Sequence, residues 1–318
     1  MNTAGTPTVP GRLYSLLLKL RPLQRGTLMP FSGELVHGAF IHWLKDAAPD
    51  VATWLHDGNK RRLFTCSSLL FPVPAQRMLE AERANVHLPL DPEKTYTVRI
   101  TLLLGELFPL FHEALMHFAT KETRAENQPF IQIGKQLFTL DEVIASNDDP
   151  SGWTRFTSCA DLVEKARTLK LGRVETLAME FATLTTFNRA NQRSKVYGGH
   201  YALLPLPQYL FQGLARRWQE LAPPELAQVV QLERIEQYIE DEGVVISDYD
   251  LKPHQVRFTT HTQPGFVGRC TYDLRGPDDV VNGSLLTVRQ QILLLAQLAF
   301  YCGAGYKTAM GLGRVRLL

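Results

Sequence analysis

The sequence predicts an α+β protein built from two tandem ferredoxin-like modules (each βαββαβ), with a glycine-rich loop close to its last residues. Three observations support this fold class. The chain has 318 residues, more than one domain usually contains. Its composition, 45% hydrophobic and 21% charged, is that of an ordinary soluble globular protein. The order strand, helix, strand, strand, helix, strand is predicted twice. One larger α+β domain is the alternative.

The first module begins with a leucine-rich, alternating strand at 12–22. A helix follows at 32–49, because apolar residues recur there at helical spacing, Ser32 stands at the cap position and Pro49 ends the pattern. Strong apolar runs predict the remaining elements, which are strands at 62–72 and 96–108, a helix at 108–120 and a strand at 136–145.

The second module repeats this order after a turn-rich stretch. Its predicted elements are a strand at 175–187, a helix at 205–221, strands at 243–251 and 255–274, a helix at 284–302 and a strand at 314–318. An additional acidic helix is predicted at 225–242. The resulting domain boundaries are a flexible N-terminus at 1–11, an N-terminal domain at 12–150, a linker at 151–174 and a C-terminal domain at 175–318.

Cysteine usage and the first residues bear on the cellular setting. The four cysteines contain no Cys-x-x-Cys pair and no histidine at zinc spacing, so we expect buried reduced thiols and no metal site. The first residues show no charged segment followed by an apolar core, and the most apolar helix is interrupted by Arg289 and Gln290. We therefore expect a cytoplasmic protein that does not associate with membranes.

Residues 302–318 are rich in glycine and positive charge and contain no acidic residue. Glycine at this density indicates positive backbone φ angles or a close approach of the backbone to another group. The neighbouring cations indicate that this group is anionic, and exposed N–H groups in such a loop can bind phosphate oxygens. The alternative is a loop that only turns the chain. No dinucleotide fingerprint and no P-loop can be drawn here, which disfavours a nucleotide-binding enzyme, and we expect no cofactor.

Four stretches, in order, resemble one known family. They are "PFSGELVHGAFIHWLKDAAPDVATWLHDGNKRRLFTCSSLL", "FATLTTFNRANQRSKVYGGHYALLPLPQYLFQGLARRW", "GFVGRCTYDL" and the glycine-rich "GAGYKTAMGLGRVRL". Together they resemble the CRISPR-associated RNA-processing endoribonucleases, the protein-six family of the RAMP group. The resemblance implies two ferredoxin-like domains, in agreement with the predicted element order.

The resemblance also implies a reaction, which is metal-independent cleavage of CRISPR repeat RNA. In that reaction the ribose 2′-hydroxyl attacks the neighbouring phosphate and leaves a 2′,3′-cyclic phosphate and a 5′-hydroxyl. A base, an acid and positive charge at the phosphate are required. The implied partners are repeat RNA or the processed guide RNA, which the protein often retains through its repeat-derived 3′ handle, and other subunits of an effector complex.

His56 is the first candidate for proton transfer, because histidine exists in both protonation states near neutral pH. It stands in a polar stretch, and the resemblance places the catalytic histidine of the family there. Lys60, Arg61 and Arg62 follow within six residues, and we expect Lys60 and Arg62 to stabilise the transition state and Arg61 to bind RNA. A surface-loop histidine without a catalytic role is the alternative.

The sequence leaves open which residue is the second proton carrier. Some members of the family use a tyrosine or a histidine from the first helix, but the matching position here is Ile41. His42 is the nearer substitute and His37 the weaker one. Five residues separate the two histidines, about 140° around a helix, so they cannot point the same way.

RNA contacts are expected from the second module. The stretch 187–201 mixes cations with tyrosine and contains no acid, as single-strand RNA-binding loops often do. A solvated flexible loop is the alternative. The predicted RNA-binding residues outside the first module are Arg189, Arg193, Lys195, His200, Gly303, Gly305, Lys307, Gly311, Gly313, Arg314 and Arg316. Arg314 and Arg316 share one strand face, where they either hold phosphates or serve as edge charges. Structural roles are assigned to the remaining histidines, which are His87, His112, His117, His254 and His261.

Two rival functions remain. A RAMP-like subunit that binds guide RNA and cleaves nothing is supported by Ile41 at the expected proton-carrier position. A generic RNA chaperone or structural α+β protein would need the glycine-rich loop only as a turn. Binding that falls as salt rises separates the RNA-binding functions from a structural one, because phosphate contacts are salt-dependent.

Overall fold

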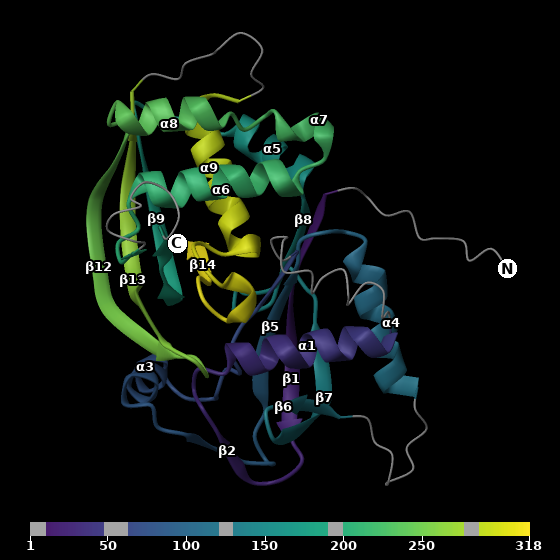
Figure 1. Cartoon of the computed structure of the whole chain (residues 1–318). Helices are drawn as coiled ribbons and strands as arrows, with labels where there is room; N and C mark the ends of the chain where they lie inside the picture. The colour runs from purple at the N-terminus through teal and green to yellow at the C-terminus, as the bar shows by residue number, and fades with distance from the viewer. Residues whose placement is uncertain (1–10, 48–62, 121–129, 190–199, 277–285) are drawn as a thin grey trace, which may run out of the picture. The chain divides into compact units, whose positions relative to one another are not determined.

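The computed structural model describes residues 11–47, 63–120, 130–189, 200–276 and 286–318. The chain divides into an N-terminal unit, Met1–Ser158 with Ala309–Gly311, and a C-terminal unit, Cys159–Thr308 with Leu312–Leu318. Figure 1 shows the elements of both units. Residues 151–174, expected to be a linker, contain β8 (Arg155–Ser158) and α5 (Cys159–Thr168), and the division between the units falls between these two elements.

The N-terminal unit has the predicted βαββαβ order. Its six main elements are β1 (Arg12–Pro22), α1 (Gly33–Ala47), β3 (Phe64–Cys66), β5 (Tyr96–Leu102), α4 (Leu107–Thr120) and β7 (Gln136–Ile144). The strands pair antiparallel in the order β3-β5-β1-β7, so β1 is central. This is the strand order of the ferredoxin-like fold, and the prediction for this half is confirmed.

Several short elements of this unit were not predicted. β2 (Gly26–Leu28) pairs with β4 (Leu88–Leu90) in a separate small sheet. α3 (Ala75–Ala84) lies between β3 and β5 in the sequence, β6 (Ile131–Ile133) continues the main sheet beyond β7, and β8 pairs with β1. β2, β4 and β6 are three residues long, too short to show the alternation that identifies a strand in a sequence.

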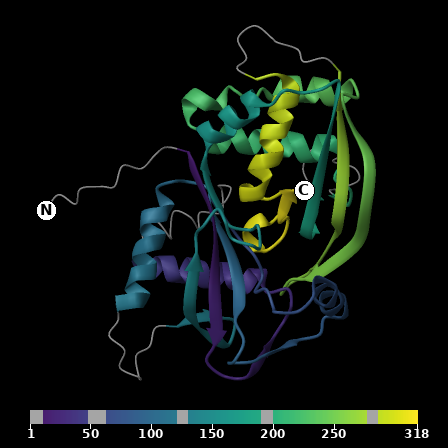
Figure 2. The same ribbon diagram turned by 180° about the vertical axis from the view of Figure 1, so that it is seen from behind.

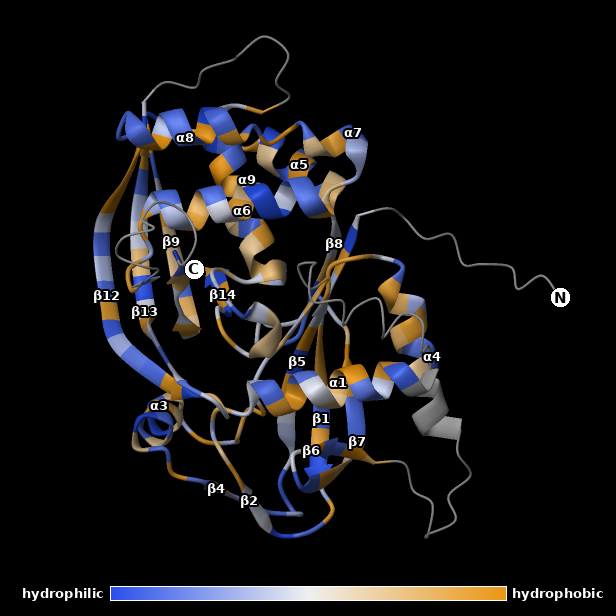
Figure 3. Ribbon diagram, viewed as in Figure 1, coloured by the Kyte–Doolittle hydropathy of each residue, from blue (hydrophilic) through white to orange (hydrophobic). Residues whose placement is uncertain are grey.

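The core of the N-terminal unit follows from two periodicities. Alternate residues of β1 enter the core, among them Leu16 and Leu18, and helical spacing on α1 brings Phe40 and Trp43 to the same core. Phe111 of α4 contacts both aromatic rings of α1, with ring centroids 6.1 Å and 5.3 Å away. Figure 3 shows hydrophobic residues following β1 and recurring along α1.

The other face of β1 and β5 carries buried polar side chains beside buried leucines. Arg99, only 3% exposed, donates from Nε to Ser15 Oγ at 2.9 Å and to the Trp153 carbonyl at 3.1 Å. Its guanidinium also lies 5.2 Å from the centre of the Trp153 ring. A buried charge requires such partners, because desolvation without them is costly.

The C-terminal unit repeats the topology. Its main elements are β9 (Val174–Thr185), α6 (Pro207–Leu221), β12 (Val244–Arg257), β13 (Thr262–Arg275), α9 (Val288–Cys302) and β14 (Val315–Leu317). The antiparallel order β12-β13-β9-β14 matches that of the first sheet. The chain is therefore a tandem pair of ferredoxin-like domains, as predicted. Other elements are β10 (Phe187–Asn188), β11 (Tyr201–Ala202), α7 (Pro224–Ala227), α8 (Leu232–Glu240) and the 3₁₀ turn η1 (Thr308–Met310).

The two main helices of this unit have clear start signals. Thr287 and Gln290 form a capping box at the start of α9, and a proline occupies the first turn of α6. α9 packs against α5, α6 and β14, which explains why it is buried almost all round (Figure 2). Trp218 of α6 is fully buried and donates from Nε1 to the Leu226 carbonyl at 3.1 Å.

The β12–β13 hairpin corrects the predicted strand boundaries. The strand expected at 255–274 is interrupted at 258–261, where the chain turns and Phe258 N donates to the His261 carbonyl at 2.8 Å. β12 instead continues from Val244 through Pro253 to Arg257. The predicted acidic helix at 225–242 is also divided, into α7 and α8.

Candidate functional site

The glycine-rich loop between α9 and β14 has the backbone that its composition predicts. Gly303, Gly305, Gly311 and Gly313 have φ angles of 71°, 86°, 90° and 67°, in the region that favours glycine. Lys307 also has a positive φ, 55°, which is uncommon for a residue with a side chain. Five residues of this short loop therefore depend on left-handed or related backbone conformations.

Many N–H groups of this loop are bonded within the C-terminal unit. Gly303 N donates to the Ala299 carbonyl at 2.9 Å, and Ala304 N to that of Gly313 at 2.9 Å. Tyr306 N donates to the Thr186 carbonyl at 2.9 Å, and Gly313 N to that of Leu184 at 2.8 Å. These four groups do not form the expected nest of exposed donors. RNA contacts by the four glycines remain a prediction.

Residues Ala309–Gly311 of the loop pack inside the N-terminal unit. His37 of α1 donates from Nδ1 to the Ala309 carbonyl at 3.0 Å and stacks on Phe64 with ring centroids 5.3 Å apart. A Cβ on Gly33, the first residue of α1, would overlap the Met310 carbonyl. The start of α1 and residues 309–311 are thus in backbone contact.

The two histidines of α1 face different surroundings, as their spacing predicts. His37 is 8% exposed and uses Nδ1 in the bond to Ala309, whereas His42 is exposed to solvent. Ile41 packs against the hydrophobic core of the unit. Of these three side chains, the exposed imidazole of His42 is the most accessible to a substrate.

The cations of β14 are divided between two environments. Val315 is fully buried, which places Arg316 on the opposite face of β14, whereas Arg314 precedes the strand. Arg316 donates from Nε to Glu180 Oε2 at 2.6 Å, so its charge is largely balanced within the sheet. Arg314 is half-buried as a residue, but Nε and Nη1 of its guanidinium are buried, and its backbone N donates to Thr183 Oγ1 at 2.9 Å.

Lys307 meets the turn of the β12–β13 hairpin. Its Nζ lies 3.8 Å from the centre of the Phe258 ring and donates to His261 Nε2 at 3.2 Å. The His261 ring stacks on Phe258, with centroids 4.9 Å apart and an interplanar angle of 5°. Because the ammonium can only donate, Nε2 is the acceptor in this contact, and Nδ1 lies 3.0 Å from Thr260 Oγ1.

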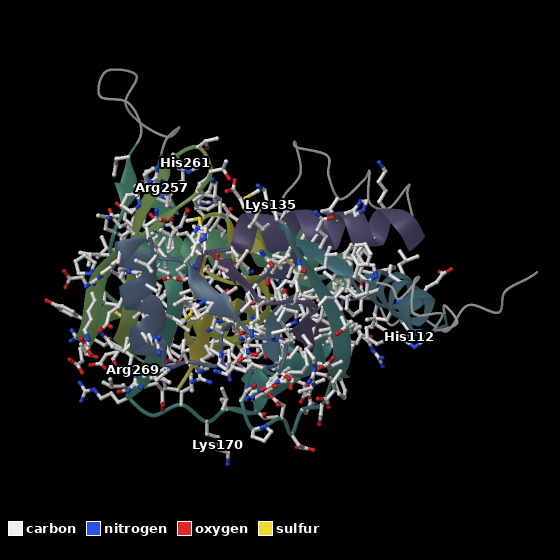
Figure 4. All side chains as sticks on the ribbon, turned by 90° about the horizontal axis from the view of Figure 1, so that it is seen from below. His112, Lys135, Lys170, Arg257, His261 and Arg269 are labelled. Carbon is white, nitrogen blue, oxygen red and sulfur yellow. The ribbon has the colours of Figure 1, made fainter. Side chains whose placement is uncertain are left out.

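The sequence predicts a structural role for His261 because it lies in a strand or loop context without a basic cluster. Its cationic neighbour, Lys307, is 46 residues away. The grouping of Arg257, Phe258 and His261 within the five residues "RFTTH" was the available signal. Figure 4 shows Arg257 and His261 together at this end of the hairpin.

Arg189 and His200 are brought together by the short β10–β11 pair. Arg189 N donates to the His200 carbonyl at 2.9 Å, and the Arg189 guanidinium lies 4.9 Å from the centre of the Tyr209 ring. Tyr201, next to His200, lies 6.2 Å from Tyr306 between ring centroids. Burial raises the pKa of the Tyr306 phenol, and the Tyr201 phenol raises it further, so the hydroxyl of Tyr306 stays neutral.

Six predicted site residues lie outside the described part of the chain. They are His56, Lys60, Arg61, Arg62, Arg193 and Lys195. Within the described ranges, no three His, Cys, Asp or Glu side chains are grouped closely enough to hold a metal ion. No helix in these ranges combines the length and hydropathy needed to span a membrane.

Comparisons with known proteins relate both units to one family. The model described as "CRISPR Cas6 N-terminal domain" matches residues 12–164, and "CRISPR-associated endoribonuclease Cas6" matches residues 179–315. A search of curated proteins finds no significant match.

Solved structures show the same fold. The product complex of Cas6 (TTHB231), a Thermus thermophilus protein, has a TM-score of 0.69 and 23% identity, covering 97% of this chain and 100% of that one. The product complex of Cas6 (TTHA0078) has a TM-score of 0.61 and 21% identity, covering 96% and 99%. Since the two family models together span nearly the whole chain, the protein belongs to the Cas6 family of CRISPR-associated endoribonucleases, which are RAMP proteins.

Proposed function

We propose that this protein cleaves CRISPR repeat RNA without a metal ion, by attack of a ribose 2′-hydroxyl on the adjacent phosphate. The observation that carries the proposal is the match of Cas6 models to both units, together with a histidine and three cations in the stretch after α1. Cas6 proteins of similar fold have been solved in a product complex and in a substrate mimic complex.

The bond changes assign the roles. A base removes the 2′-hydroxyl proton, the 2′ oxygen bonds to phosphorus, and the bond from phosphorus to the 5′ oxygen breaks as an acid protonates that oxygen. His56 serves as the base or the acid. Lys60 and Arg62 stabilise the negative charge of the transition state, and Arg61 contributes to RNA binding.

His42 is the proposed second proton carrier. It is exposed on α1, the helix that precedes His56 in the sequence. His37 is the weaker candidate, because its ring is buried and Nδ1 is bonded to a backbone carbonyl.

The decisive experiment is cleavage of end-labelled repeat RNA in excess EDTA, with analysis of the product ends. We expect one cut, a 2′,3′-cyclic phosphate and a 5′-hydroxyl. A repeat with a single 2′-deoxy substitution at the nucleotide before the cut should bind normally and remain intact, because the nucleophile is missing. Loss of cleavage in EDTA that magnesium restores would contradict the proposed mechanism.

Binding of intact repeat RNA without any cleavage would instead identify a non-catalytic guide-RNA-binding subunit. We also propose that the cleaved RNA remains bound through its repeat-derived 3′ end and that the complex joins an effector assembly. Size-exclusion chromatography after cleavage tests retention, and rapid separation of protein from product would contradict it.

A further inference from the structure

The end of the β12–β13 hairpin meets the glycine-rich loop in a cluster of cations and aromatic rings. This hairpin-end cluster consists of Arg257, Phe258, His261, Tyr306 and Lys307. All five residues belong to the C-terminal unit. Lys307 Nζ contacts both aromatic neighbours from the hairpin, at 3.8 Å from the Phe258 ring centre and 3.2 Å from His261 Nε2, so the two segments are joined at the side chains.

His261 provides a flat ring at the surface. Phe258 is 2% exposed and covers one face of the imidazole, while His261 itself is exposed to solvent. The near-parallel stacking and the bond from Nδ1 to Thr260 fix the plane of the ring. A fixed, exposed aromatic face is what a nucleobase stacks on in single-strand RNA-binding proteins.

The charge of this end of the hairpin suits a phosphate. Residues 251–263 and 301–318 contain no Asp or Glu. Further along the same hairpin, Asp248, Asp250 and Asp273 make the strands acidic. Figure 4 shows Arg257 and His261 at one end of the hairpin and Arg269 away from them. Positive charge is thus concentrated where the aromatic rings lie.

The backbone of Lys307 is a second indication of function. Its φ of 55° is unfavourable for a residue with a Cβ, in a loop where four other positive φ angles are occupied by glycine. The conformation places the ammonium on Phe258 and beside His261. A strained conformation that presents a charged group is a reason to look for a ligand.

We infer that the hairpin-end cluster is a binding site for one unpaired nucleotide of RNA. The base stacks on the outer face of His261, and its phosphate lies between Lys307 and Arg257. Tyr306 and the adjacent Tyr201 extend the aromatic surface toward a neighbouring nucleotide. The inference rests on the proposed function, in that the ligand is RNA, and it adds recognition of a single-stranded segment.

The test measures binding of two short probes by fluorescence anisotropy, a hexamer of uridylate and a hexamer of abasic ribose phosphate with the same charge. We expect the wild type to prefer the uridylate probe. His261→Ala should weaken uridylate binding at least about fivefold and leave the abasic probe unaffected, because stacking on one base is lost. His261→Phe should stay within about twofold of the wild type, because the stacking surface is kept.

Matched controls come from other exposed residues. His112→Ala removes an exposed histidine of the N-terminal unit and should change neither affinity. Lys307→Asn, which tolerates the left-handed backbone, should weaken both probes and reduce the salt dependence by about one phosphate contact, while Lys170→Asn should not.

Equal affinity of His261→Ala and His112→Ala for uridylate, or no preference of the wild type for uridylate over the abasic probe, would overturn the inference. The repeat-cleavage assay is read separately. If the wild type cuts repeat RNA while His261→Ala matches its control, only the nucleotide site is wrong. If the hexamer results hold and repeat RNA is neither bound nor cut, only the proposed function is wrong.

Discussion

The second and third strands of the two ferredoxin-like units occupy the same topological positions but are connected in different ways. In the N-terminal unit β3 has three residues, and α3 and β4 are inserted before β5. In the C-terminal unit β12 and β13 have 14 residues each and are joined by a four-residue turn. The uninterrupted hairpin brings aromatic and basic side chains to the glycine-rich loop. Equal topology therefore leaves the connections free to carry different functions.

The segments that follow the first helix of each unit also differ, in charge. After α1 the sequence contains the basic residues 60–62, whereas after α6 it continues into the acidic α7 and α8. We therefore expect the N-terminal unit to carry the bond-breaking chemistry and the C-terminal unit to contribute to RNA binding. The predictions below test this difference, from the largest expected effect to the smallest.

Loss of the imidazole at position 56 should have the largest effect. His56→Ala should lower the single-turnover cleavage rate by roughly 10²–10⁴-fold with affinity for repeat RNA unchanged, because proton transfer is lost and phosphate contacts remain. The matched control is His87→Ala, an exposed histidine of the same unit. Full activity of His56→Ala would move the catalytic assignment to His42.

Replacing a helix glycine by alanine should lower the free energy of unfolding only where the added Cβ meets residues 309–311. Gly33→Ala forces a Cβ into the Met310 carbonyl and should lower the free energy of unfolding by about 1–3 kcal/mol. Gly38→Ala in α1 and Gly213→Ala in α6 have no atom within 4 Å of the added Cβ and should raise it by about 0.5–1 kcal/mol. Urea denaturation measures all three. A stabilised Gly33→Ala would show that residues 309–311 do not pack on α1.

Stability should fall at alkaline pH because of buried thiols. Burial raises the pKa of Cys159 from 9.0 to about 12, and burial also raises that of Cys66. Between pH 9 and 12 the Cys159 thiol ionises only in the unfolded chain. The contribution of the neutral thiol to the free energy of unfolding is therefore complete below pH 9 and is lost as the pH rises through this range. For Cys159 the loss from pH 8 to pH 10 is about 1.4 kcal/mol.

The measurement is urea denaturation at pH 8 and pH 10. Between pH 8 and pH 10, Cys159→Ala should lose about 1.4 kcal/mol less free energy of unfolding than the wild type, whatever its stability at pH 8. Identical pH dependence in both proteins would mean that the Cys159 thiol is accessible to solvent in the folded state.

The smallest effect is expected at the ion pairs. Arg316→Met removes the partner of Glu180 in the C-terminal unit and should change stability by less than about 1 kcal/mol, like Arg21→Met, which breaks the exposed pair with Asp141 in the N-terminal unit. Thermal unfolding compares the two. Repeat-RNA binding by Arg316→Met with an unchanged salt dependence would show that Glu180, and not phosphate, is the partner of this arginine.

The main fold could be predicted because each long element carries a strong local signal. β1 is rich in leucine, α6 begins with proline, and α9 has both members of a capping box. α5 was missed although Leu162, Val163 and Ala166 have helical spacing, because the surrounding polar residues were interpreted as a linker. The turn at 258–261 was missed because it contains neither glycine nor proline.

The candidate site was less predictable, because its contacts join distant parts of the sequence. Lys307 was predicted as a binding residue, but the role of His261 depends on a neighbour that only the fold supplies. The pairing of Arg316 with Glu180 likewise follows from the register of β14 against β9. The catalytic assignment of His56 rests on the resemblance to the family and on the adjacent cations.

The three residues Ala309–Gly311 have a consequence for the order in which the protein is made. They belong to the N-terminal unit, yet a ribosome adds them only after nearly all of the C-terminal unit has been synthesised. The bond from His37 to Ala309 spans 272 residues, so it can form only after the residues of the C-terminal unit between them have been synthesised. A fragment that ends at Ser158 would leave the His37 N–H without that carbonyl. The N-terminal unit is thus completed only after most of the C-terminal unit has been synthesised.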